Sequence, residues 1–153
     1  MCKRLQQASC VSVVTILFWA TLVSGQAPYP IYTASHLAST MESLGPNFRA
    51  TMQFVDARNY PAAKERVARA REQLATTVVF WRQHEIDDAT SLVQDTVALM
   101  DLLDHALSVT SVDQQTVLRL ASEIRANCDA CHQVYREEDP ATGELRLTAG
   151  FGG

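Results

Sequence analysis

Cysteine is scarce in this sequence, and the few cysteines are unevenly placed. Only four of the 153 residues are cysteine, and Cys2 and Cys10 fall within the first 25 positions. The remainder of the chain contains only Cys128 and Cys131, so a framework of several disulfides is excluded there. The second Cys/His pair that a structural zinc site would need is also missing.

The sequence also lacks an apolar run long enough for a comfortable membrane span, which needs about 20 residues. Its apolar run covers residues 11–23, follows two basic residues, and ends at the small residues Ser24 and Gly25. That order is typical of a secretory signal peptide over residues 1–25, which would export the chain to the periplasm with no stable membrane insertion after cleavage. An uncleaved membrane anchor is the alternative interpretation.

Basic charge is in short supply as well. Without Lys3 and Arg4 of the predicted signal peptide, the 13 basic residues fall to 11 against 17 acidic residues, a net charge of −6. An acidic chain gives no support to nucleic-acid binding. It would suit a protein partner with a basic docking patch.

The stretch that carries chemistry lies near the C-terminus and reads Cys128-Asp129-Ala130-Cys131-His132. On a helix, two thiols three residues apart lie on one face, from which both can reach the two vinyl groups on one side of a porphyrin. His132 is the i+4 neighbour of Cys128, so its imidazole can bind the iron as a proximal histidine does. Cys-x-x-Cys-His is typical of covalent attachment of a c-type haem, and we expect one haem c, with its iron, per chain.

Cys-x-x-Cys alone has three other interpretations. A thioredoxin-like redox pair belongs in a βαβ setting, and no strand pattern flanks this motif. Half of a zinc site would need the missing second pair of ligands. A simple disulfide between Cys128 and Cys131 is the third alternative in an exported protein. The adjacent His132 and the helical context favour haem over all three.

Apolar residues recur at helical spacing from about residue 33 to residue 136 and predict an all-α fold. Short connections between the helices favour an antiparallel, up-down-up-down four-helix bundle. We expect a four-helix domain over residues 26–140 and a flexible, glycine-containing tail over residues 141–153. The helices are expected at about 33–57, 61–83, 87–109 and 110–136.

Several helix ends and one helix interior carry recognisable signals. Pro46 lies inside the first stripe, which stays in phase across it, so one kinked helix is expected there. Asp87 or Asp88 can cap the third helix. Ser111 and Gln114 fit a capping box for the fourth.

The inward face of each helix follows from the apolar stripe. Cys128 and Cys131 continue the stripe of the fourth helix, so the haem is expected to lie against the bundle interior. The predicted stripes comprise Leu37, Met41, Leu44, Phe48, Met52 and Val55; Val67, Ala70, Leu74, Val78 and Trp81; Leu92, Thr96, Leu99, Leu103 and Ala106; and Val117, Leu120, Ala121, Ile124 and Tyr135.

The run Cys128-x-x-Cys131-His132-x-x-Tyr135-Arg136, closing the last of four helices, resembles the cytochrome c′ family, the class II c-type cytochromes. The resemblance covers about residues 33–138. It implies that Cys128 and Cys131 carry the haem, that His132 is the proximal iron ligand, and that Arg136 lies near the proximal face. It also implies pairing into a homodimer through the first two helices.

Members of this family differ in what occupies the other face of the iron. Low-spin members supply a methionine from the first helix and transfer electrons, and Met41, four residues before Gly45, matches their pattern. The resemblance thus implies Met41 as the distal iron ligand and a carrier of single electrons between periplasmic redox proteins, with no enzymatic activity. Simple core packing is the alternative role for Met41.

High-spin members leave that face of the iron open and bind small gases. The alternative function is therefore a five-coordinate cytochrome c′ that binds nitric oxide or carbon monoxide. In that case Met41 would turn away and Leu37 or Phe48 would line the open face.

Overall fold

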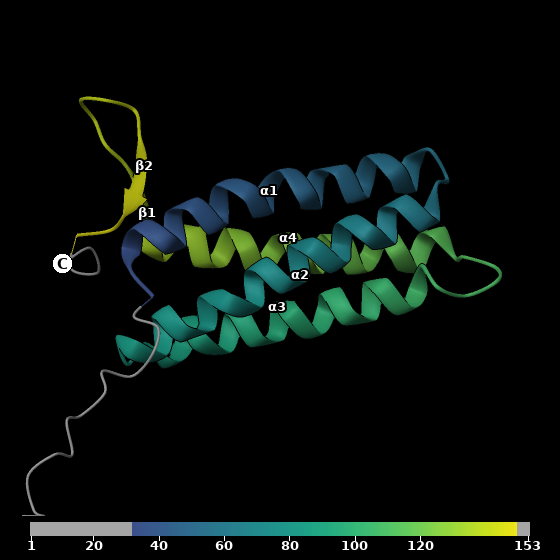
Figure 1. Ribbon diagram of the computed structural model, residues 1–153, viewed down its shortest axis with the longest axis horizontal. Helices are drawn as coiled ribbons and strands as arrows, with labels where there is room; N and C mark the ends of the chain where they lie inside the picture. The colour runs from purple at the N-terminus through teal and green to yellow at the C-terminus, as the bar shows by residue number, and fades with distance from the viewer. Residues whose placement is uncertain (1–31, 150–153) are drawn as a thin grey trace, which may run out of the picture. The chain divides into compact units, whose positions relative to one another are not determined.

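The computed structural model describes residues 32–149, which form four helices and one short hairpin (Figure 1). The predicted signal peptide, residues 1–25, and the end of the predicted tail lie outside the described residues. No helix within residues 32–149 is long and apolar enough to cross a membrane. The elements are α1 (Ala34–Asp56), α2 (Tyr60–Gln83), α3 (Asp87–Ala106), α4 (Gln114–Tyr135), β1 (Arg136–Glu138) and β2 (Leu145–Leu147).

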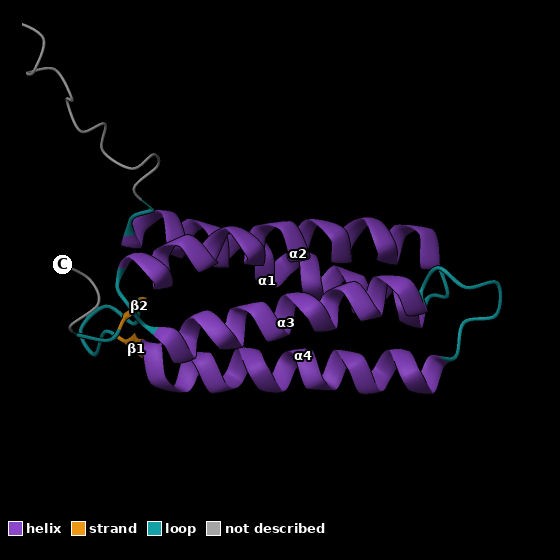
Figure 2. Cartoon of the chain, turned by 90° about the horizontal axis from the view of Figure 1, so that it is seen from below, coloured by secondary structure: helices purple, strands orange, loops and turns teal. Residues whose placement is uncertain are grey.

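The four helices form the expected bundle, in which successive helices run in opposite directions (Figures 1 and 2). Each helix packs closely on the next one along the chain, whereas the backbones of α1 and α4 stay farther apart. The start of α1 and the end of α4 lie at the same end of the bundle. The prediction of an all-α four-helix bundle is confirmed.

The first helix is a single element, as the phase of its stripe predicts. α1 continues through Pro46. Its N-terminus is a capping box. The Thr33 hydroxyl accepts from the His36 N–H at 3.2 Å, and the His36 ring nitrogen Nδ1 accepts from the Thr33 N–H at 3.3 Å. His36 therefore satisfies backbone groups that the start of a helix leaves unpaired.

Two predicted caps are wrong. The N-cap of α3 is Ile86, so Asp87 and Asp88 lie inside the first turn rather than before it. The cap of α4 is Asp113, whose carboxylate accepts from the backbone N–H groups of residues 115 and 116 at 3.1 and 3.2 Å. Ser and Asp cap helices about equally well, so the path of the backbone, which begins the helix at residue 114, makes Asp113 the cap in place of Ser111.

The core matches most of the predicted stripes but is rotated on α3. Val93 and Met100 are buried there, whereas the predicted Leu92 and Leu99 are only half-buried. Both rows of α3 are apolar, so spacing alone could not tell which row faces inward. The buried threonines Thr77 and Thr96 satisfy their hydroxyls on carbonyls of their own helices, at 2.7 and 2.6 Å.

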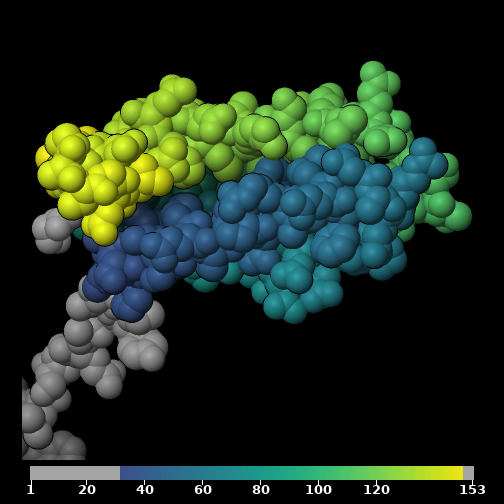
Figure 3. All heavy atoms as spheres, turned by 90° about the horizontal axis from the view of Figure 1, so that it is seen from above, coloured from purple at the N-terminus to yellow at the C-terminus, as the bar shows by residue number. Residues whose placement is uncertain are grey.

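The segment expected to be a flexible tail contains a strand. β2 pairs antiparallel with β1, from Arg136 opposite Leu147 to Glu138 opposite Leu145. Leu147 packs against the core, and the Thr148 N–H donates to the Tyr135 carbonyl at 3.1 Å. The C-terminal residues thereby cover the end of α4, next to the first turns of α1 (Figure 3).

Candidate functional site

The two cysteines of the motif lie in the last two turns of α4, on the face that meets the bundle interior. Cys128 and Cys131 are half-buried and pack against the hydrophobic core. Neither forms a disulfide in the structure. The sequence placed both on the inward stripe, and the structure bears out that placement.

Burial makes these thiols weakly acidic. Burial, together with the nearby Asp129, raises the pKa of Cys128. Burial, Cys128 and the carboxylate of Asp88 raise the pKa of Cys131 to about 11. Reactive cysteines of disulfide oxidoreductases have a lowered pKa, so this environment differs from that of a thioredoxin-like pair.

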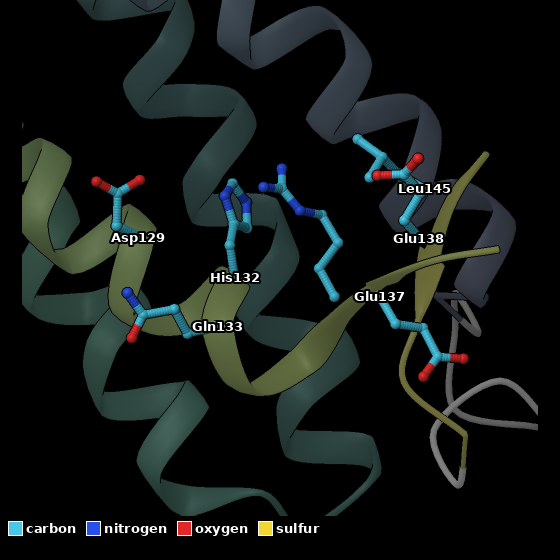
Figure 4. Close-up of a pocket in the computed structure, with 7 residues that line it drawn as sticks. Asp129, His132, Gln133, Glu137, Glu138 and Leu145 are labelled. Carbon is cyan, nitrogen blue, oxygen red and sulfur yellow. The ribbon is translucent and has the colours of Figure 1, made fainter. Parts of the chain in front are cut away.

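His132 stands beside the cysteines at the wall of an open hollow of about 350 Å³. In Figure 4 its ring and the Asp129 carboxylate rise from the same side of α4, while Gln133 points elsewhere. Burial, and next the Arg136 guanidinium, lower the pKa of His132, which Asp129 partly opposes. A neutral imidazole is the form that binds metal. The hollow is lined by Asp129, His132, Gln133, Arg136, Glu137, Glu138 and Leu145.

Met41 approaches the same level of the bundle from α1. It is half-buried and packs against the core. Met41 is seven residues after the start of α1, and Cys128 is seven residues before the end of α4. At ~1.5 Å per residue both lie about 10 Å from helix ends that share one end of the bundle.

The other histidines and methionines have simpler roles. The His84 ring nitrogen Nδ1 pairs with the Phe80 carbonyl at 2.8 Å, and His105 is exposed on α3. Met100 is fully buried in the core. Within residues 32–149, no group of three or more His, Cys, Asp or Glu side chains is arranged to hold a metal ion.

Sequence reasoning missed the partner of Tyr135. The Tyr135 hydroxyl donates to Asp88 Oδ2 at 2.6 Å, and its ring lies 4.9 Å from that of Trp81. Burial and this bond raise the pKa of Tyr135 to about 12, and the bond holds the pKa of Asp88 below its usual range. No local pattern reveals such a bond, because its two residues are 47 positions apart.

One buried donor near the motif has no acceptor. The indole N–H of Trp81 is buried and makes no hydrogen bond, the only such side-chain atom in the described part of the chain. An unpaired buried donor costs about 1–3 kcal/mol unless something satisfies it. The two free thiols, the neighbouring imidazole and this unpaired donor beside Tyr135 are the features that fit a bound group.

Comparison with known proteins adds no identification. The chain matches no protein-family model, no curated protein and no solved structure. The likeness to the cytochrome c′ family is therefore one of motif and helix pattern.

Proposed function

We propose that this chain is an exported mono-haem c-type cytochrome of the four-helix class, which carries single electrons between periplasmic partners. The observation that supports it best is the shared placement of Cys128, Cys131 and His132. All three are half-buried on adjacent positions at the end of α4, and the cysteines face the apolar core. When bound, a haem supplies a one-electron iron couple.

The residues of the chain have distinct tasks in this proposal. The Cys128 and Cys131 thiols would hold the haem through two C–S bonds, formed by addition of each S–H across a vinyl group. The imidazole of His132 serves as the proximal ligand. Arg136, whose charge lowers the pKa of His132, favours the neutral imidazole that a ligand requires.

Met41 is the distal ligand in this proposal. Its half-buried position on α1, at about the level of Cys128, supports a thioether that would bind the iron of a haem held by α4. A Met/His ligand pair raises the reduction potential. Ligation by both His132 and Met41 would leave no site for a gas and would suit electron transfer.

The charge distribution supports a basic partner. Residues at the motif end of the bundle come from the α2–α3 turn, the end of α4 and the hairpin (Figures 1 and 2). Opposite charges steer association and raise its rate. That end carries eight acidic residues against three arginines: Glu85, Asp87, Asp88, Asp129, Glu137, Glu138, Asp139 and Glu144 against Arg82, Arg136 and Arg146.

A five-coordinate gas-binding protein is the second candidate. The observation that favours it is the packing around Met41, since Leu37 and Leu44, about one turn to either side, are buried at 3% and 6% exposure. With Met41 packed among them, these side chains would give the iron an apolar open face for nitric oxide or carbon monoxide.

An optical spectrum of the purified chain separates these candidates. Covalent haem is first tested by haem staining after denaturing electrophoresis, with Cys128→Ser/Cys131→Ser as the negative control. Sharp, split reduced bands that carbon monoxide leaves unchanged are expected for His132/Met41 ligation. Met41→Leu should abolish that spectrum, whereas Met52→Leu, a matched half-buried methionine of α1, should retain it.

Other outcomes would redirect the proposal. A broad reduced spectrum that shifts with carbon monoxide would overturn Met41 ligation and favour gas binding. A chain that retains no haem after export through a haem-attaching host would overturn both candidates.

A further inference from the structure

The last turn of α4 is held by residues from α2, from α3 and from the segment after β2. Tyr135 is 5% exposed, its ring lies against Trp81 at the end of α2, and its hydroxyl donates to Asp88 at the start of α3 at 2.6 Å. Its carbonyl accepts from the N–H of Thr148, which follows β2, at 3.1 Å. The end of this helix therefore has fixed partners on several sides.

The acceptor on α3 is itself held in place. Asp88 Oδ1 accepts from the Ala89 N–H at 2.9 Å, which leaves Oδ2 for the Tyr135 hydroxyl. A hydrogen bond to a charged carboxylate is shorter and stronger than one between neutral groups. The bond therefore joins the first turn of α3 to the last turn of α4 with a defined geometry.

This bond acts on the turn that carries the proposed haem ligand. His132 lies three residues before Tyr135, and the His132 carbonyl accepts from the Arg136 N–H. His132 and Tyr135 therefore share the last turn of α4. α4 packs closely along α3. The Tyr135–Asp88 bond adds a side-chain tie between this turn and the first turn of α3.

We propose that Tyr135, through Asp88, is a positioning residue that fixes the orientation of His132. The inference rests on the proposed haem site. It concerns the hydroxyl of Tyr135, because a phenylalanine could provide the same burial and ring packing but not the hydrogen bond to Asp88. Loss of the hydroxyl leaves the Trp81 contact and the fold intact, but frees the turn to move and lets the imidazole rotate.

The test uses single variants of the full chain, purified as exported. Tyr135→Phe removes the donor and Asp88→Ala removes the acceptor. Asp88→Asn keeps only one acceptor oxygen, for which the Ala89 N–H and the Tyr135 hydroxyl compete, and serves as the intermediate variant. Asp87→Asn is the matched control, because it removes one charge from the same turn and has no bond to Tyr135.

The first readout is amide hydrogen exchange over residues 131–136, which needs no haem. We expect at least about tenfold faster exchange there in Tyr135→Phe and Asp88→Ala, a smaller increase in Asp88→Asn, and wild-type exchange in Asp87→Asn. Unchanged exchange in Tyr135→Phe overturns the inference. The exchange measurement gives this answer even if no haem is attached. Failure of the inference is therefore distinguished from failure of the proposed function.

The second readout is the iron of the haem-loaded chain. We expect shifted g-values in electron paramagnetic resonance and a shifted reduction potential in both single variants, with the double variant no further shifted than the larger single one. Faster exchange with wild-type g-values and potential overturns the inference, because the bond would then only stabilise the fold.

Discussion

The Arg146 guanidinium of β2 donates from Nε to Glu137 Oε1 of β1 at 2.9 Å. Its Nη1 also donates to Asp139 at 2.8 Å. One arginine thus joins the two arms of the hairpin on its solvent side, while Leu147 packs on the core side. Because Glu138 and Leu145 of this hairpin line the hollow beside His132, its closure shapes one wall of the candidate site.

Arg146→Gln should loosen this wall without unfolding the bundle. We expect faster amide exchange over residues 145–148, because the two ion pairs are lost. The melting temperature should change little, since exposed ion pairs contribute little to stability. Arg119→Gln, which removes an exposed ion pair with Glu123 elsewhere on α4, should leave that exchange unchanged. Equal exchange in both variants would contradict the role of Arg146.

Two adjacent leucines of α3 should differ sharply in their contribution to stability. Leu103 is fully buried, whereas Leu102 is 55% exposed. Leu103→Ala leaves a cavity and should lower the free energy of unfolding by about 2–5 kcal/mol. Leu102→Ala should change it by about 0.5 kcal/mol or less. Urea denaturation measures both, and comparable losses would contradict the buried position of Leu103 and the exposed position of Leu102.

The cap of α4 predicts a pH dependence of stability. Hydrogen bonds from the Thr116 hydroxyl and from the backbone N–H groups of Gln115 and Thr116 hold the pKa of Asp113 below its usual range. A carboxyl whose pKa is lowered by folding stabilises the protein above its unfolded pKa of about 3.9, and this stabilisation is lost as the pH falls through the folded value.

Asp113→Asn tests that cap directly. Asparagine caps helices as well as aspartate, so the variant should match the parent chain near pH 7. Below about pH 4 its melting temperature should fall less steeply with pH than that of the parent chain. Parallel pH profiles would mean that Asp113 does not titrate with folding.

The acidic motif end should control reaction with small charged oxidants. Glu138→Lys/Glu144→Lys should slow oxidation of the reduced haem protein by hexaammineruthenium(III), a cation, and speed oxidation by ferricyanide, an anion. The effect should be several-fold at low ionic strength and shrink as salt screens it. Asp56→Lys, at the opposite end of the bundle, should change neither rate appreciably. Equal effects of both substitutions would show that electrons leave elsewhere.

Local sequence signals predicted some features of the fold better than others. The four helices, the continuity of α1 through Pro46 and the inward cysteines of α4 all follow from apolar spacing. The cap of α4 could not be predicted in this way. Ser111 and Asp113 are both good capping residues, and only the path of the backbone decides between them. The strand at Leu145 was missed because its partner β1 directly follows a helix and is only three residues long.

By itself, the sequence determined the chemistry that this chain can offer. The spacing of Cys128, Cys131 and His132 is set by the amino-acid order, and helical periodicity then places them on one face. Only the tertiary structure decided what surrounds them, because contacts between distant segments leave no local pattern. The Tyr135–Asp88 bond, the hairpin beside His132 and the level of Met41 all arise when α1, α3 and β2 are brought to the end of α4.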